Sequence, residues 1–182
     1  VLVTNCYFIG NQSRNSGGGI YLTGGMATEC TVRENSATNN GGGVYMGGVS
    51  ATVDRCWVES NIARGAEGGG GLYMKNGMLK NSSITSNRAI HATAGHGGGI
   101  RAEQGQISAC QIEGNVANNL GGGIRLGAGT IMASRICSNI AGDGGGVRLD
   151  SASCVLSNSL IGNNFSGNGC GGVIQIAGTI SR

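Results

Sequence analysis

Two short signals alternate along this 182-residue chain, and each recurs every 23 to 28 residues. The first is a glycine-rich step into an aliphatic residue, as in Gly17-Gly18-Gly19-Ile20, which returns at Val44, Leu72, Ile100, Ile124, Val147 and Val173. The second is an apolar residue three positions before an asparagine, as in Phe8 and Asn11. A period in this range is typical of proteins that stack one structural unit on the next.

Within each repeat, apolar and polar residues alternate as they do in a strand with one buried face. In Ile20-Tyr21-Leu22 the outer two residues face inward and Tyr21 faces outward. A second short strand, which includes Cys6 and Phe8, ends before the asparagine. The aliphatic Val3 lies three residues before Cys6, and this odd spacing marks a bend or bulge between two short strands. We therefore predict a parallel coil of about seven turns of 23–28 residues, with three short strands per turn.

In such a coil, matching residues of successive turns form columns. Asparagine tolerates left-handed backbone and bonds to neighbouring backbone groups, so we expect an asparagine ladder along one corner. Glycine supplies strained dihedral angles at another corner. Each turn buries about four aliphatic side chains, each worth roughly 1.5–3 kcal/mol when fully buried. The expected ladder consists of Asn11, Asn35, Asn61, Asn87, Asn115, Asn139 and Asn163.

The composition excludes several other classes of protein. The 38 glycines lack the three-residue period of collagen, and proline is absent. Only 12% of residues are charged and the aliphatic residues recur in register, unlike in a disordered chain. The net charge of +3 is dispersed, so we expect no nucleic-acid partner. No stretch is apolar for long enough to cross a bilayer, so we expect no membrane insertion by this segment.

The paired signals resemble the repeats of the polymorphic outer-membrane-protein family, which alternate a Gly-Gly-Ala-aliphatic step with a Phe-x-x-Asn step. Here the steps read Gly17-Gly18-Gly19-Ile20 and Phe8-Ile9-Gly10-Asn11, and the resemblance covers the whole chain. The chain departs from that pattern by using glycine for alanine and Val, Ile or Leu for Phe in six turns. The resemblance implies a right-handed parallel β-helix of the pectin-lyase-like class in a bacterial surface or secreted protein.

The outward position after each glycine step forms a column of three tyrosines and three arginines. Aromatic faces suit sugar rings and stacked guanidinium groups suit a polyanion, although tyrosine also simply favours strands and surface arginine is often only solvated. Glu103 and Asp150 follow two of the arginines by two residues, whereas Gly127 leaves Arg125 without an expected partner. The candidate binding residues are Tyr21, Tyr45, Tyr73, Arg101, Arg125 and Arg148.

Two loops that lead to a glycine step are longer than the others and should protrude on one side. One carries Glu67 and the other carries His91 and His96, which we add to the candidate binding residues. Histidine beside a carboxylate suits acid–base catalysis or metal binding, and Gly95-His96-Gly97 resembles an element of polygalacturonases, which share the β-helix fold. Glycosidic cleavage usually needs two positioned carboxyl groups, and the three aspartates are not paired in sequence. We therefore predict no catalytic residue, no metal site and no cofactor.

Four of the seven cysteines fall in one inward column, where serine or asparagine occupies the same phase in other turns. Stacked turns lie about 4.8 Å apart, which is within the Cα range of a disulfide, so disulfides or a soft-metal ladder are one interpretation. The other is that cysteine is a small buried residue interchangeable with serine, and the free substitution favours it. The column consists of Cys6, Cys30, Cys56, Ser82, Cys110, Ser134 and Asn158.

We expect residues 1–182 to form one β-helix domain, either a segment of a longer solenoid or a unit that stacks end to end. The predicted function is a non-enzymatic extracellular or cell-surface module, such as a stalk, an adhesin passenger or a fibre component. Its expected partner is a polysaccharide, a cell-surface glycan or another copy. The alternative is a polysaccharide lyase or glycoside hydrolase, which carboxylates converging within about 10 Å in a groove would favour.

Overall fold

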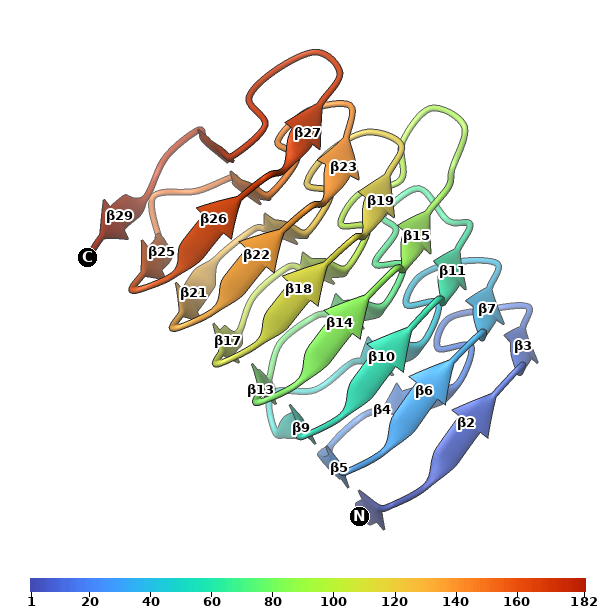
Figure 1. Cartoon of the computed structure of the whole chain (residues 1–182). Coiled ribbons are helices and arrows are strands. Elements are labelled where there is room, and N and C mark those ends of the chain that lie inside the picture. The colour runs from blue at the N-terminus through green and yellow to red at the C-terminus, as the bar shows by residue number, and fades with distance from the viewer.

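The structure, a computed structural model, describes residues 1–182 as one β-helix whose two termini lie at opposite ends of the coil (Figure 1). Its 29 short strands form four parallel sheets, and each turn contributes one strand to each sheet. The predicted all-β parallel coil of about seven turns is therefore confirmed. None of the elements is a helix able to cross a lipid bilayer.

The first and second sheets meet at the corner that carries the cysteine and serine column. The first sheet contains β1 (Leu2–Thr4), β5 (Gly25–Thr28), β9 (Ala51–Asp54), β13 (Met78–Lys80), β17 (Gln106–Ser108), β21 (Gly129–Met132), β25 (Cys154–Ser157) and β29 (Thr179–Ser181). The second sheet contains β2 (Tyr7–Ile9), β6 (Thr31–Arg33), β10 (Trp57–Glu59), β14 (Ser83–Thr85), β18 (Gln111–Glu113), β22 (Arg135–Cys137) and β26 (Leu160–Gly162).

The third and fourth sheets are joined by the glycine-rich loops. The third sheet contains β3 (Gln12–Ser13), β7 (Ser36–Ala37), β11 (Ile62–Ala63), β15 (Arg88–Ala89), β19 (Val116–Ala117), β23 (Ile140–Ala141) and β27 (Phe165–Ser166). The fourth sheet contains β4 (Ile20–Leu22), β8 (Val44–Met46), β12 (Leu72–Met74), β16 (Ile100–Ala102), β20 (Ile124–Leu126), β24 (Val147–Leu149) and β28 (Val173–Gln175).

The prediction of three strands per turn was wrong, because the third sheet adds a fourth. Its strands have two residues each and directly follow the asparagine column. The second residue of each strand points inward, and in five turns it is a buried alanine. Two residues are too few to show a period-two pattern, so the strand left no recognisable signal in the sequence. The inward alanines are Ala37, Ala63, Ala89, Ala117 and Ala141.

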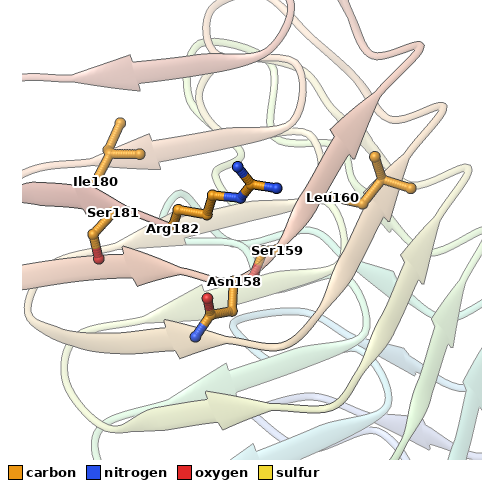
Figure 2. A pocket seen from close by; sticks show the side chains of 6 residues that line it. All are labelled: Asn158, Ser159, Leu160, Ile180, Ser181 and Arg182. Atoms are coloured by element: carbon orange, nitrogen blue, oxygen red, sulfur yellow. The ribbon is translucent and has the colours of Figure 1, made fainter.

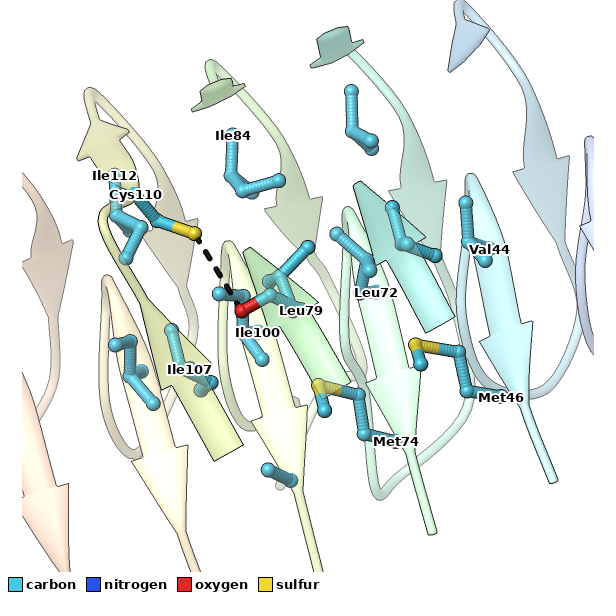
Figure 3. Packing of buried hydrophobic residues seen from close by; sticks show 14 of the residues in the cluster. Val44, Met46, Leu72, Met74, Leu79, Ile84, Ile100, Ile107, Cys110 and Ile112 are labelled. Carbon is cyan, nitrogen blue, oxygen red and sulfur yellow. Dashed lines mark hydrogen bonds between the residues drawn. The ribbon is translucent and has the colours of Figure 1, made fainter. Parts of the chain in front are cut away.

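The core is built from vertical columns of aliphatic side chains that come from facing sheets (Figure 3). In the fourth sheet, for example, Leu72 pairs with Ile100, and both are fully buried. Met46 and Met74 fill the space beside this column, since methionine adapts its shape to irregular gaps. Each turn alone would leave these side chains exposed, so burial ties the turns to one another.

Two corners of each turn depend on a residue with left-handed backbone, placed one position before a column residue. Ala109, with φ 51°, precedes Cys110, and Ser86, with φ 56°, precedes Asn87. The tolerance of asparagine for left-handed backbone, which suggested it for this corner, is not used by the observed ladder members, none of which has a positive φ. Their side chains instead bond inside the coil, which holds them in place while the preceding residue makes the corner.

The asparagine column is a continuous hydrogen-bonded ladder. The Nδ2 atom of Asn61 donates to Oδ1 of Asn87 at 2.9 Å and to the backbone carbonyl of Val32 at 2.9 Å. The backbone N–H of Asn61 donates to the same Oδ1 atom. Because the buried amide groups of the column have hydrogen-bond partners, these bonds offset the cost of removing them from water. Its members are Asn11, Asn35, Asn61, Asn87, Asn115, Asn139 and Asn164.

The last member of the ladder is Asn164 and not Asn163, as the sequence period predicted. Asn139 donates to Oδ1 of Asn164 at 3.0 Å, whereas Asn163 has φ 54° and makes the corner before it. The register changes at β25, because the connection between β24 and β25 is longer than the one between β20 and β21. Consequently Leu160, the apolar residue three positions before Asn163, is 56% exposed, and Ile161, three positions before Asn164, packs against the core.

Candidate functional site on the outer face of the fourth sheet

The six tyrosines and arginines predicted to form a stripe do lie in one column on the outer face of the fourth sheet. Strand pairing places each residue directly opposite the next, from Tyr21 to Arg148. The rings of Tyr21 and Tyr45 stack with centroids 4.6 Å apart, and those of Tyr45 and Tyr73 stack at 5.4 Å. The column is thus a short aromatic stack followed by a row of guanidinium groups.

The side chains of this column point away from the core, but most of those in its middle are not exposed to solvent. Tyr21 is 56% exposed, but Tyr45 is 7%, Tyr73 is 3% and Arg101 is 8% exposed. The interpretation of the stripe as an open surface of tyrosine and arginine therefore does not hold for its middle. The role of the six residues in binding stays a prediction, and only Tyr21 offers a free aromatic face.

Carboxylates from neighbouring segments contact the middle of the column. Glu67, from the loop before β12, accepts from Nε of Arg101 at 3.3 Å. Nη1 of Arg101 also donates to the backbone carbonyl of Ala102 at 2.7 Å. The hydroxyl of Tyr73 donates to the carboxylate of Glu103. Burial, and then this hydrogen bond to Glu103, raise the pKa of Tyr73 above its ordinary value, so the phenol stays protonated.

The arginines at the end of the column share carboxylates across turns. Arg125 was expected to lack a partner. Its Nε atom directly contacts the carboxylate of Asp150, a residue of the next turn, at 2.8 Å. Arg148 contacts the same carboxylate at 2.7 Å and also Asp143 at 3.2 Å. Burial acts to raise the pKa of Asp150, but the hydrogen bonds and charges of the two arginines outweigh it and lower the pKa. This carboxylate is therefore held in its ionised form.

His96 lies beside this ion-pair network, whereas no contact links His91 to it. The Nδ1 atom of His96 is buried and has no hydrogen-bond partner. Burial, followed by the positive charge of Arg125, lowers the pKa of His96 to about 4, so its ring is neutral near pH 7. The loop between β15 and β16, which carries His91, protrudes from the coil (Figure 1). The Nδ1 atom of His91 accepts from the backbone N–H of Thr93 at 3.4 Å.

Four carboxylates therefore lie on one outer face, a convergence that the sequence spacing of the aspartates did not show. Each is already bound to an arginine or a tyrosine: Glu67, Glu103, Asp143 and Asp150. A glycosidase needs a general acid whose pKa is raised, and the pKa of Asp150 is lowered. The arrangement thus consists of ion pairs and one tyrosine–carboxylate hydrogen bond. No group of three or more His, Cys, Asp or Glu side chains is arranged to hold a metal ion.

A comparison with protein families matches residues 1–131 to a family described as the right-handed β-helix region. The chain belongs to this family. No curated protein and no solved structure matches it. This family match agrees with the four parallel sheets of the structure. A fold does not specify a ligand or an activity, so both are argued below from the site itself.

The structure of the cysteine column supports the interpretation that its cysteines are small side chains equivalent to serine. The Cys56 thiol donates to the carbonyl of Asp54 at 3.3 Å, and the Ser82 hydroxyl makes the same bond to Lys80 at 2.7 Å. Thiol and hydroxyl thus close the same corner, and all seven cysteines are free. Burial raises the pKa of Cys56 and of Cys110 to about 11, so these thiols stay protonated.

The seventh position of this column is Ser159 and not Asn158, which follows from the same change of register. Asn158 has φ 47° and makes the corner, while the Ser159 hydroxyl donates to the carbonyl of Ser157 at 2.8 Å. The largest hollow of the β-helix, about 730 Å³, lies beside this corner and is bounded by the final residue, Arg182 (Figure 2). None of its lining residues belongs to the ion-pair network, and we assign no ligand to it.

Proposed function

We propose that this β-helix is a non-enzymatic structural or adhesive module of an extracellular or cell-surface protein, such as a stalk or an adhesin passenger. The observation that carries this proposal is the pairing of every carboxylate on the fourth sheet with an arginine or a tyrosine. Such pairing stabilises a surface, but it withholds the free acid and base that polysaccharide cleavage requires.

The asparagine ladder supports a mechanical role. A row of seven side chains, most of them fully buried, bonds each turn to the next through backbone and side-chain nitrogen. A coil bonded along its whole length in this way resists bending, as a stalk must. The surface location and the likeness to polymorphic outer-membrane proteins rest on the repeated glycine and asparagine signals alone.

A polysaccharide-cleaving enzyme is the second candidate. It is favoured by one observation, the four carboxylates gathered on one face with the neutral ring of His96 nearby. In that case an ion pair would open on substrate binding and release an acid. The pKa of Asp150, lowered by two arginines, argues against this residue as the acid.

The two candidates differ in turnover. The purified protein is incubated with pectin, alginate or chondroitin sulfate, and new reducing or unsaturated ends are measured over one day. The structural proposal predicts the same rate as a protein-free blank. Turnover above the blank that is lost in Asp150→Asn and in Glu103→Gln would overturn the proposal, since both variants preserve side-chain size.

A further inference from the structure

A second hollow, of about 400 Å³, lies on the outside of the second sheet and is unrelated to the ion-pair network. The hollow arises from the side chains that strand pairing places next to one another. Trp57, Ser83 and Gln111 are direct neighbours on β10, β14 and β18, so a short side chain stands between two long ones. Ala109, at the adjoining corner, adds a second small residue to its lining. The result is a depression with an indole at one end and an amide at the other.

The residues around this groove offer unused hydrogen-bonding groups. Trp57 is 56% exposed and lines the groove together with Ser83. None of the side-chain hydrogen bonds of the fold involves the indole N–H of Trp57 or the hydroxyl of Ser83. Gln111 donates through Nε2 to Glu113 at 2.9 Å, which leaves its Oε1 atom as a free acceptor. The groove thus combines an aromatic surface that carries its own N–H donor with one hydroxyl and one free amide acceptor.

The charged groups at the rim are already satisfied. The guanidinium of Arg55 contacts Asp54 at 3.0 Å and Glu29 at 3.1 Å, and it also donates to the hydroxyl of Thr28. Asn81 donates to the other oxygen of Asp54 at 2.9 Å. Arg55 is thus the only charged residue in the lining of the groove, and it is paired. Arg135, the exposed neighbour of Gln111 on β22, lies outside the lining. Recognition in this groove therefore depends on one aromatic surface and on neutral hydrogen-bonding groups.

We propose that this groove binds a pyranose ring of a neutral polysaccharide. The apolar face of the ring stacks on the Trp57 indole, and ring hydroxyls bond to Ser83 and to Oε1 of Gln111. Tryptophan suits this role because it combines a large apolar surface with one polar N–H. The volume lies within the range of about 300–1,000 Å³ typical of small-ligand sites. The inference deepens the proposed adhesive function and rests on it only for the cellular setting.

Trp57 is the only tryptophan of the chain, so its fluorescence reports on this groove alone. We would titrate the protein with cellohexaose, xylohexaose and mannohexaose, and with hexagalacturonate as the acidic comparison. The expected result is a saturable change with at least one neutral oligosaccharide and a Kd of roughly 1 mM or below, typical of a small weak site. Hexagalacturonate should bind at least several-fold more weakly than that ligand.

Two variants on either side of Trp57 provide a matched pair. Ser83→Leu fills the groove and should weaken binding at least tenfold. Thr31→Leu makes a similar change on the opposite neighbour of Trp57, outside the groove, and should bind within about twofold of the parent. Circular dichroism of both variants verifies that the coil is intact. Isothermal titration of Trp57→Ala, which lacks the reporter, should show no heat of binding.

The inference is overturned if none of the three neutral oligosaccharides gives a saturable change, if both leucine variants lose binding equally, or if the acidic oligosaccharide binds tighter. These results leave the proposed non-enzymatic role standing, because that role is judged by turnover. Conversely, turnover of a polysaccharide would contradict the proposed role and would leave the groove's ligand preference unaffected.

Discussion

Asn61 and Asn87 are joined by two hydrogen bonds inside the coil, since Nδ2 and the backbone N–H of Asn61 both donate to Oδ1 of Asn87 at 2.9 Å. Both residues are fully buried. One carbonyl oxygen therefore satisfies a side chain and a backbone group of the neighbouring turn. This repeated bond holds the corner next to the left-handed residue and sets the register of the whole β-helix.

The change of register near the last turns gives a first test. Asn164→Ala removes the acceptor for the backbone and side chain of Asn139, so it should cost about 2 kcal/mol or more of unfolding free energy. Asn163 has a left-handed backbone that glycine adopts readily, so Asn163→Gly should change the free energy of unfolding by less than about 0.5 kcal/mol. Urea unfolding of both variants measures the difference. A larger loss in Asn163→Gly would mean that the period of the sequence had located the ladder correctly.

The fourth strand of each turn gives a second test. Ala63 points into the core from a two-residue strand and is fully buried. Ala63→Leu should overpack this site and destabilise the protein by about 1–3 kcal/mol. Ile62→Leu, on the outer face of the same strand, should change stability by less than about 0.5 kcal/mol. Equal effects of the two substitutions would show that this strand does not present a fixed inner face.

The left-handed corners predict that a glycine can stabilise the coil. Ala109 has φ 51°, a conformation that costs an alanine about 1–2 kcal/mol. Ala109→Gly removes this cost at the expense of chain entropy, so we expect a net gain of about 0.5–1 kcal/mol. Ala117→Gly, in a regular strand, should lose about 1 kcal/mol. Thermal unfolding ranks the two variants, and a loss in both would contradict the corner geometry.

These corners also show what could be predicted from the sequence. Repetition of one glycine step and one asparagine fixes the coil, because stacked turns need matching residues at matching corners. The two-residue strands are too short for a periodic signal. In the last turn, Leu160 before Asn163 and Ile161 before Asn164 both match the asparagine signal, so the sequence does not distinguish them. The observed ladder spacing from Asn139 is 25, to Asn164, and not the 24 of the preceding turn.

The candidate site was harder to predict because it depends on contacts between turns. Register alone placed Tyr73 and Arg101 on the outer face, but it carried no information on the loops that cover them. The partner of Arg125 is Asp150, which lies one turn further along the chain. The groove at Trp57 arises from a small neighbour on the next strand, and its one sequence signal is a lone tryptophan at an outward position.

His96 makes the stability of the protein depend on pH. Burial, followed by the charge of Arg125, lowers its pKa in the folded state to about 4, whereas the unfolded chain binds the proton near pH 6.5. Glu67, Arg101 and Asp150 are the other charges that act on it. The unfolded state therefore binds more protons below pH 6.5, and stability falls as the pH drops from 6.5 toward 4.

His96→Gln should weaken this dependence, because glutamine does not titrate. Urea unfolding at pH 7.5 and at pH 4.5 gives the loss for each protein. Carboxylates contribute to both proteins alike, so the difference between the two losses reports the histidine. We expect a smaller loss in the variant, and an identical loss in both would show that His96 is not buried as a neutral ring.

The most direct measurement of the central claim, that buried asparagines bind the turns together, is the unfolding free energy of Asn87→Ala. This change leaves two buried N–H groups of Asn61 without their acceptor and removes the side-chain donor to the carbonyl of Val58. We predict a loss of at least about 3 kcal/mol, against less than about 0.5 kcal/mol for Asn118→Ala, whose single bond is exposed. Equally small losses in both variants would contradict the ladder as the element that holds the β-helix together.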